Sequence, residues 1–242
     1  MKKFALVCGA SGEIGQSICR KLAEDGWSLY LHYNASRQTV QMLLEQLVVC
    51  YPKQEFLIVQ ADFSLDDGAQ TLASQIFSLQ AILFANGHAY YGLLEDTPVN
   101  EMAKLWKVHV QNPMQTTALL ASKLRSNPSS YILLIGSIWG DAGAAGEVVY
   151  SAVKGAQHSF VKAYAQEAAY NGIRVNGIAP GIIDTKMNAV LDEQERTEIV
   201  DQIPLQAFGK TEDIANMVAF LFSGKADYVT GQIVRVNGGW YI

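Results

Sequence analysis

The sequence has few cysteines and no long apolar run, and both shortages exclude classes of protein. Its three cysteines, Cys8, Cys19 and Cys50, are odd in number and lack CxxC spacing, so neither a disulfide framework nor a zinc site is indicated. No run approaches the roughly 20 apolar residues that span a bilayer. The apolar run FALVC breaks at Gly9, too early for a secretory signal. We therefore expect a cytoplasmic protein without a metal or a membrane partner.

The sequence also lacks an excess of positive charge. It has 18 Lys and Arg residues against 23 Asp and Glu residues, a formal net charge of −5, which argues against a nucleic-acid-binding face. Hydrophobic residues make up 50% of the 242 residues, enough to bury a large core in one domain. No shift in composition, low-complexity stretch or long linker divides the chain. We therefore predict a single domain over residues 1–242.

Short apolar runs alternate with helical stretches along the whole chain. The runs lie near residues 3–8, 28–33, 56–60, 80–84, 131–136, 173–178 and 231–236. Continuous apolar runs are typical of strands that are buried on both faces of a parallel sheet. The alternation predicts an α/β fold, a single-domain doubly wound (Rossmann) parallel seven-stranded sheet with helices on both faces. Ligands of such sheets bind in a crevice at the carboxyl ends of the strands.

A glycine turn follows the first predicted strand. Gly9, Gly12 and Gly15 lie between this strand and a helix that ends at Gly26. Glycines at such a turn let the backbone approach a ligand, and the helix N-terminus offers free N–H groups to a pyrophosphate. The spacing is GxxGxxG instead of the usual GxGxxG, so a tight structural turn is the alternative interpretation.

The segment after the second predicted strand contains no acidic residue between Gly26 and Glu45. In dinucleotide folds an acidic residue near this place holds the ribose hydroxyls, whereas an arginine accepts a 2′-phosphate. Asn34, Ser36 and Arg37 stand there instead. We therefore predict NADPH (NADP⁺) as the cofactor, with Ser36 and Arg37 as phosphate ligands. Arg37 could equally be a solvated residue at the start of a helix.

A serine, a tyrosine and a lysine carry the predicted chemistry. Tyr150 and Lys154 are four residues apart in YSAVK, which places both side chains on one face of a helix. An ammonium group favours phenolate, so Lys154 could lower the Tyr150 pKa from its usual value of about 10. Ser137, at the end of a predicted strand, could hold a carbonyl oxygen beside the phenol. The three suit carbonyl reduction or alcohol oxidation, whereas YxxxK alone could be a surface pair.

Taken together, these motifs resemble the short-chain dehydrogenase/reductase family. GASGEIG, ADF at 61–63, FANG at 84–87, Ser137, YSAVK, IRVNGIAPGIIDT and the tail from residue 208 follow the family's order over nearly the whole chain. The IPL, EDIA and VTGQ segments are most similar to the bacterial 3-oxoacyl-acyl-carrier-protein reductases. The resemblance implies an NADPH-dependent oxidoreductase of fatty acid biosynthesis, with a 3-oxoacyl thioester as its first candidate substrate and a dimer or homotetramer as its assembly.

The resemblance also implies roles for individual residues. Tyr150 is the expected acid/base, Lys154 lowers its pKa and holds the nicotinamide ribose, and Ser137 is the ligand of the carbonyl oxygen. Asp62 is expected beside the adenine ring. The other expected cofactor-binding residues are Gly9, Ser11, Gly12, Ile14, Gly15, Asn34, Ser36, Arg37, Phe63, Asn86, Gly87, Pro180, Gly181, Ile183 and Thr185.

Several positions depart from the family's pattern, and Cys8 stands in place of the leading threonine of TGxxxGxG. Glu13 replaces the second glycine of TGxxxGxG, so its side chain must point away from the phosphates or repel them. The family's NNAG reads FANG, with Phe84 and Ala85 in place of its two asparagines, which puts a helix-supporting contact in doubt. His109 stands where the family has its fourth catalytic residue, an asparagine. These changes would also suit a nucleotide-binding sensor without catalytic activity.

His109 has two interpretations. The family's asparagine organises a water molecule that links the lysine to solvent. An imidazole, with a pKa near 6.5, could hold the same water or shuttle the proton itself. The alternative is a helix histidine that is bonded to a backbone carbonyl. We expect His109 to be the fourth catalytic residue.

Two segments are expected to enclose the substrate. Residues 184–208 could form a mobile lid that carries the apolar residues Met187, Val190 and Leu191, or an amphipathic helix packed permanently on the sheet. Trp139 and the small residues after it would form another wall. Glu147, like Asp141, disfavours a strongly anionic substrate head, unless the two are solvated loop charges.

The expected carrier protein is acidic, and reductases of this group meet it with basic residues. Pro128 and Asn171 stand at those positions here. A CoA thioester, another 3-oxo compound or a hydroxylated small molecule are therefore alternatives to the acyl carrier protein.

Overall fold

The computed structural model describes residues 2–188 and 191–241. All seven strands form one parallel sheet in the order β3-β2-β1-β4-β5-β6-β7. They are β1 (Phe4–Cys8), β2 (Ser28–Tyr33), β3 (Phe56–Gln60), β4 (Ala81–Phe84), β5 (Ser130–Ile135), β6 (Ile173–Pro180) and β7 (Ile233–Val236). The predicted doubly wound sheet is confirmed, and all seven apolar runs are strands.

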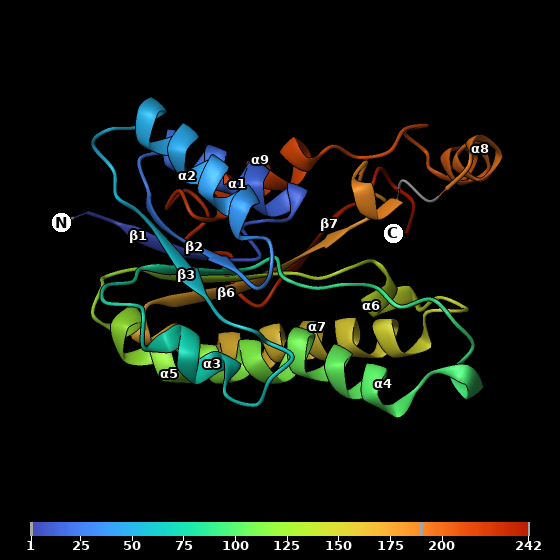
Figure 1. Cartoon of the computed structure of the whole chain (residues 1–242), viewed down its shortest axis with the longest axis horizontal. Coiled ribbons are helices and arrows are strands. Elements are labelled where there is room, and N and C mark those ends of the chain that lie inside the picture. Colours follow the sequence, from blue (N-terminus) through green and yellow to red (C-terminus); the bar gives the residue numbers. More distant parts are fainter. Residues whose placement is uncertain (1, 189–190, 242) are drawn as a thin grey trace.

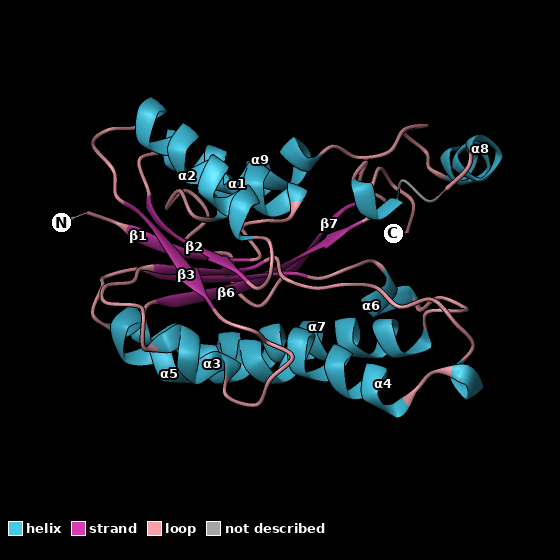
Figure 2. Cartoon of the chain, viewed as in Figure 1, coloured by secondary structure: helices cyan, strands magenta, loops and turns pink. Residues whose placement is uncertain are grey.

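Helices cover both faces of the sheet (Figures 1 and 2). One face carries α1 (Glu13–Glu24), α2 (Arg37–Cys50) and α9 (Thr211–Leu221). The opposite face carries α3 (Gly68–Ala73), α4 (Val99–Trp106), α5 (Asn112–Arg125) and α7 (Val148–Ala168). The π-helical turn η2 (Lys107–Gln111) joins α4 to α5, and η1 (Leu94–Asp96), η3 (Ala169–Asn171) and η4 (Lys186–Asn188) are short 3-10 turns. Among the described residues, no helix combines the length and apolar character that a bilayer crossing requires.

Neighbouring residues of a central strand point into two separate cores. Leu6 and Tyr30 belong to the cluster that also contains residues of α5 and α7, whereas Val7 and Leu31 belong to the cluster of α1 and α9. All six residues of β2 are buried. Burial on both faces explains why these strands are almost continuously apolar instead of alternating.

The carboxyl ends of the strands position the functional residues. Gly9 follows β1, Asn34 follows β2, Asn86 lies just after β4, and Ser137 lies just after β5. Because parallel strands end at the same edge of the sheet, these residues meet there. Two short helices, α6 (Trp139–Ala142) and α8 (Glu193–Gln202), lie beside this edge, near the C-terminal residues (Figure 1).

Candidate active site

Close packing requires two of the three glycines in the turn after β1. Gly9 has a φ of +84°, and a Cβ atom there would lie 2.7 Å from the Asn86 nitrogen. A Cβ atom at Gly15 would overlap the Gly9 carbonyl. A Cβ atom at Gly12 would meet only the Gly9 oxygen, at 3.5 Å. The turn therefore packs tightly against β4 and α1 and leaves Gly12 beside open space.

A cleft of about 240 Å³ opens beside this turn. Eight of the predicted cofactor residues line it: Gly9, Ser11, Gly12, Asn34, Asp62, Phe63, Asn86 and Gly87. Gly12 is the N-cap of α1 and its helix has no side-chain cap, so the first N–H groups of α1 are available to an anion. A glycine cradle at an uncapped helix N-terminus fits a dinucleotide pyrophosphate.

The other predicted cofactor residues are not part of the lining of this cleft. Ser36 and Arg37 are exposed at the start of α2 and do not line the cleft. Ile14 packs against the core. Pro180 is the last residue of β6, and Ile183 and Thr185 lie in the loop that follows it. Their contacts with a cofactor stay predictions.

Glu13 points across to the loop after β6. Its Oε2 atom accepts a hydrogen bond from the backbone N–H of Lys186 at 2.6 Å. The extra carboxylate is therefore engaged by a segment that is 173 residues away in the sequence.

His32 is a residue of this cleft that the sequence did not reveal. Its Nδ1 atom accepts a hydrogen bond from the Gly9 N–H at 3.2 Å, and Nε2 donates to the Ala61 carbonyl at 3.1 Å. Burial lowers the pKa of His32 to about 4, so the ring is neutral at physiological pH. A lone polar residue near the end of the apolar run SLYLHY was the only signal in the sequence.

Ser137, Tyr150 and Lys154 lie together, as their motifs predict. Ser137 and Tyr150 line one cavity of about 230 Å³. The Nζ atom of Lys154 lies over the Tyr150 ring, 5.4 Å from its centroid. It donates a hydrogen bond to the Ile135 carbonyl at 2.9 Å. The Ser137 hydroxyl accepts one from the Trp139 N–H at 3.2 Å. The arrangement gives a bound oxygen access to two hydroxyl groups.

The charges around Tyr150 differ from the expectation. Burial raises the pKa of Tyr150, the carboxylate of Glu147 raises it further, and the hydroxyl of Ser137 lowers it. Burial also lowers the pKa of Lys154 to about 7. The expected net lowering of the Tyr150 pKa by Lys154 is therefore wrong for this structure, because desolvation penalises both charged forms. The phenol is held neutral, which is the form that can donate a proton.

His109 lies in η2 with only 1% of its surface exposed. Its Nε2 atom lies 2.9 Å from the His88 carbonyl and 3.3 Å from the His88 nitrogen, and in the tautomer that carries its proton on Nε2 it donates to that carbonyl. Its ring meets the Tyr150 ring edge-on at 5.7 Å. Nδ1 is buried and has no partner among residues 2–188 and 191–241. Burial and the charge of Lys154 lower the His109 pKa well below its usual value. The histidine is thus neutral, bonded to a backbone carbonyl, and offers one free acceptor.

The backbone around His109 is fitted to its ring. A Cβ atom at Gly87 would overlap the His109 imidazole, so the glycine of FANG is required by this histidine. The His109 carbonyl accepts a hydrogen bond from the Gln157 side chain at 2.7 Å. These contacts fix the ring beside Tyr150, and its catalytic role stays a prediction.

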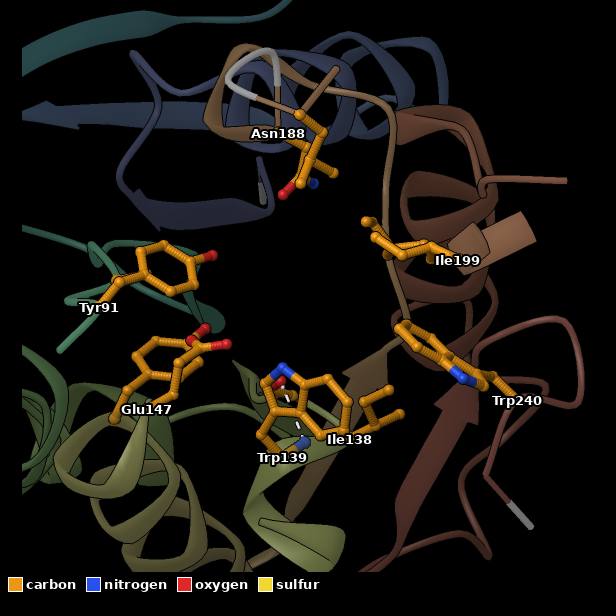
Figure 3. Close-up of a pocket in the computed structure, with 13 residues that line it drawn as sticks. Tyr91, Ile138, Trp139, Glu147, Asn188, Ile199 and Trp240 are labelled. Carbon is orange, nitrogen blue, oxygen red and sulfur yellow. Dashed lines mark hydrogen bonds between the residues drawn. The ribbon is translucent and has the colours of Figure 1, made fainter. Parts of the chain in front are cut away.

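Aromatic and apolar side chains enclose the cavity in front of Tyr150. Figure 3 shows Tyr91, Trp139, Glu147, Ile199 and Trp240 around one open space. Tyr91 and Trp240 are not among the residues that the sequence analysis assigned to the site.

The predicted lid contributes to this cavity. Asn188, Leu191 and Ile199, all within 184–208, line it. The side chain of Met187 and the whole of Val190 lie outside the described part of the chain. Closure of this segment over a substrate stays a prediction.

The two acidic residues between Trp139 and Tyr150 have different surroundings. Asp141 bonds to His158 Nδ1 and to Arg235 Nη2, each at 3.0 Å, and does not line the cavity. Glu147 lines the cavity and is 9% exposed. Neither is a freely solvated loop charge.

Comparisons with known proteins agree with this architecture. A family model described as enoyl-(acyl carrier protein) reductase matches residues 9–241. The chain is 43% identical over 242 residues to an uncharacterized oxidoreductase, YmfI, of Bacillus subtilis, with both chains covered completely. It is 32% identical over 246 residues to the 3-oxoacyl-(acyl-carrier-protein) reductase FabG of Staphylococcus epidermidis, again with 100% of both covered.

Solved structures give the same result. A blue fluorescent protein from a metagenomic library, in complex with NADPH, superposes with a TM-score of 0.92 at 28% identity, covering 99% of this chain and 98% of that one. A Serratia marcescens short-chain dehydrogenase/reductase superposes with a TM-score of 0.91 at 26% identity, covering 98% and 97%.

Proposed function

The chain belongs to the short-chain dehydrogenase/reductase family of oxidoreductases, and we propose that it uses NADPH to reduce a substrate carbonyl to an alcohol. The convergence of Ser137, Tyr150 and Lys154 beside a glycine-lined cleft carries the proposal. NADPH is supported by the absence of an acidic residue after β2, by the presence of Arg37, and by the NADPH complex of a structural relative.

Residues of the cleft would hold the cofactor. The N-terminus of α1 and Gly12 would receive the pyrophosphate, Asp62 and Phe63 the adenine end, and Lys154 the nicotinamide ribose. When bound, the nicotinamide supplies a hydride, which is chemistry that no side chain provides.

The chain's own residues then bind and protonate the carbonyl oxygen. The hydroxyls of Ser137 and Tyr150 face the same cavity and would stabilise the negative charge that develops on the oxygen. Tyr150, held as the neutral phenol, donates its proton to that oxygen. The ammonium form of Lys154, close to the ring, would stabilise the phenolate that remains.

His109 would take part in returning a proton to Tyr150. Its buried Nδ1 atom is an acceptor without a partner in the described chain, and its ring contacts Tyr150. A water molecule between Nδ1 and Lys154 would connect the lysine to the histidine. We propose that His109 and this water molecule replace the catalytic asparagine of the family.

A 3-oxoacyl thioester is the first candidate substrate, because FabG is similar over its whole length. That candidate would place the protein in fatty acid biosynthesis. Pro128 and Asn171 are exposed and uncharged, so docking of an acidic carrier protein lacks its two expected cations. A CoA thioester is therefore the form to test first.

We further propose a cytoplasmic homo-oligomer, a dimer or a tetramer. Trp106, Met114 and Leu119 are exposed on the adjacent helices α4 and α5, and apolar exposure of this kind is typical of an interaction surface. The cysteines are free, which suits a reducing compartment. Light scattering of the purified protein tests the assembly, and a monomer would contradict it.

A substrate screen at the cofactor's absorbance tests the proposed function. Acetoacetyl-CoA, ethyl acetoacetate and simple ketones are offered with NADPH and NADH in parallel. We expect carbonyl-dependent oxidation of NADPH and a slower reaction with NADH. Tight NADPH binding without turnover of any carbonyl would favour the sensor instead.

A further inference from the structure

Glu147 places a carboxylate in the wall of the catalytic cavity. The residue is the N-cap of α7, three positions before Tyr150, yet its side chain makes no capping hydrogen bond. It is 9% exposed, and burial raises its pKa. No described residue gives this carboxylate a hydrogen bond or an opposite charge. The side chain is therefore nine-tenths buried, without a partner, and faces the cavity (Figure 3).

An unpaired carboxylate in this place is costly in two ways. Burial raises the pKa of this carboxylate, so its charged form is disfavoured. Its negative charge also raises the pKa of Tyr150, which opposes the phenolate that forms when the proton leaves. Asp141, in the preceding helix α6, shows the contrast, because it is bonded to both His158 and Arg235. A merely structural carboxylate at position 147 would be expected to have such partners.

The rest of the cavity favours a positive charge. Tyr91, Trp139 and Trp240 line it, and the two indole rings meet edge-on with centroids 5.4 Å apart. The faces of aromatic rings attract cations, and tryptophan does so most strongly. No lysine or arginine is among the described residues of the lining. An anion beside aromatic rings is the combination that recognises quaternary and other ammonium groups.

From these contacts we infer that the substrate carries an ammonium-type cation, bound between the carboxylate of Glu147 and the rings of Trp139 and Trp240. The inference rests on the proposed carbonyl reduction and names its substrate class. The carbonyl lies at Ser137 and Tyr150 while the cation neutralises Glu147. The uncharged acyl chain of a 3-oxoacyl thioester lacks this cation, so we expect cationic ketones to be the better substrates.

The reaction itself is unchanged by the cation. Bound NADPH would supply the hydride that the carbonyl carbon receives, which leaves NADP⁺, and Tyr150 would supply the proton that the oxygen receives. The ammonium group keeps all its bonds and acts only in binding.

A matched set of three methyl ketones tests the inference. One ends in a trimethylammonium group, the second in an isosteric tert-butyl group, and the third in a carboxylate, each separated from the carbonyl by the same methylene chain. We expect kcat/KM with NADPH to be about tenfold or more higher for the ammonium ketone than for its neutral isostere. The carboxylate ketone should be the slowest of the three.

Two variants assign the preference to Glu147. Glu147→Gln keeps the shape and removes the charge, so the ammonium preference should be lost and the carboxylate ketone should improve. Glu95→Gln removes an exposed carboxylate outside the cavity lining and should leave the preference intact. Unchanged NADPH affinity in both variants verifies that they are folded.

The outcomes separate this inference from the proposed function. Equal or faster turnover of the neutral isostere by the unaltered protein would overturn the ammonium inference and leave carbonyl reduction standing. An ammonium preference that survives in Glu147→Gln would overturn it as well. Failure to reduce any ketone or thioester would overturn both.

Discussion

The carboxylate of Glu13 accepts a hydrogen bond from the backbone N–H of Lys186 at 2.6 Å and so joins the turn after β1 to the loop after β6. Glu13 stands in the first turn of α1, where the helix dipole attracts anions. A side-chain anion therefore lies close to the proposed pyrophosphate site and also holds the start of the proposed lid.

Glu13→Gln should strengthen NADPH binding. The change removes a negative charge near the proposed phosphates but keeps an acceptor for the Lys186 N–H. Charges at an exposed site are worth a few tenths to about 1 kcal/mol, so we expect the Kd to fall about threefold at low salt and less at high salt. Fluorescence titration measures it. Glu24→Gln, at the far end of the same helix, is the control, and weaker binding by Glu13→Gln would contradict the prediction.

His109→Ala should slow turnover far more than it weakens NADPH binding. The change removes the acceptor at Nδ1 and the ring that contacts Tyr150, and loss of proton resupply should cost about tenfold or more in kcat. His109→Asn restores the residue of the family and should recover most of the rate. Steady-state kinetics and a NADPH titration measure both effects. Unchanged turnover of His109→Ala would remove this residue from the mechanism.

Glu147→Gln should move the alkaline limb of the kcat profile to lower pH for an uncharged ketone. Reduction needs the protonated phenol, so the rate falls as pH rises through the Tyr150 pKa. Burial and the Glu147 charge raise that pKa, so removing the charge lowers it. Ser137, Tyr91, Lys154 and His109 also face the phenol and are unchanged in the variant. An alkaline limb that stays in place would show that Glu147 does not act on Tyr150.

His32 should make the folded protein sensitive to acid. Its pKa is lowered to about 4 from 6.5, so the unfolded chain binds more protons in this interval. The stability that depends on a neutral His32 is fully present above pH 6.5 and is lost as pH falls toward 4. The free energy of unfolding falls by about 3 kcal/mol over this interval. His32→Gln should reduce the loss between these two pH values. Urea unfolding of both proteins measures it, and an identical pH dependence would contradict the prediction.

The parallel seven-stranded sheet could be predicted because the local runs of apolar residues determine its strands. The apolar runs are long enough to indicate doubly buried strands. Parallel strands must end at one edge of the sheet, and Gly9, Asn34, Gly87 and Ser137 each follow a strand at that edge. His32 was missed because a polar residue within an apolar run carries no sign of what it will bond. Its partners, the Gly9 N–H and the Ala61 carbonyl, come from two other segments.

The electrostatics of the site could not be predicted, because they depend on burial and on distant contacts. The YxxxK spacing indicates a Tyr150–Lys154 pair, but burial raises the Tyr150 pKa and lowers the Lys154 pKa. Asp141 and Glu147 look alike in the sequence, and only the fold gives His158 and Arg235 to the former. Tyr91 and Trp240 could not be placed for the same reason.

The central claim is that Tyr150 is the proton donor of a carbonyl reductase. The most direct measurement is the NADPH-dependent rate of Tyr150→Phe on whichever carbonyl the unaltered protein reduces best, together with its NADPH affinity. We predict that kcat falls by about 100-fold or more, while NADPH binding changes little, because the phenol ring and its packing remain. A Tyr150→Phe protein that binds NADPH and keeps its reductase rate would contradict the account.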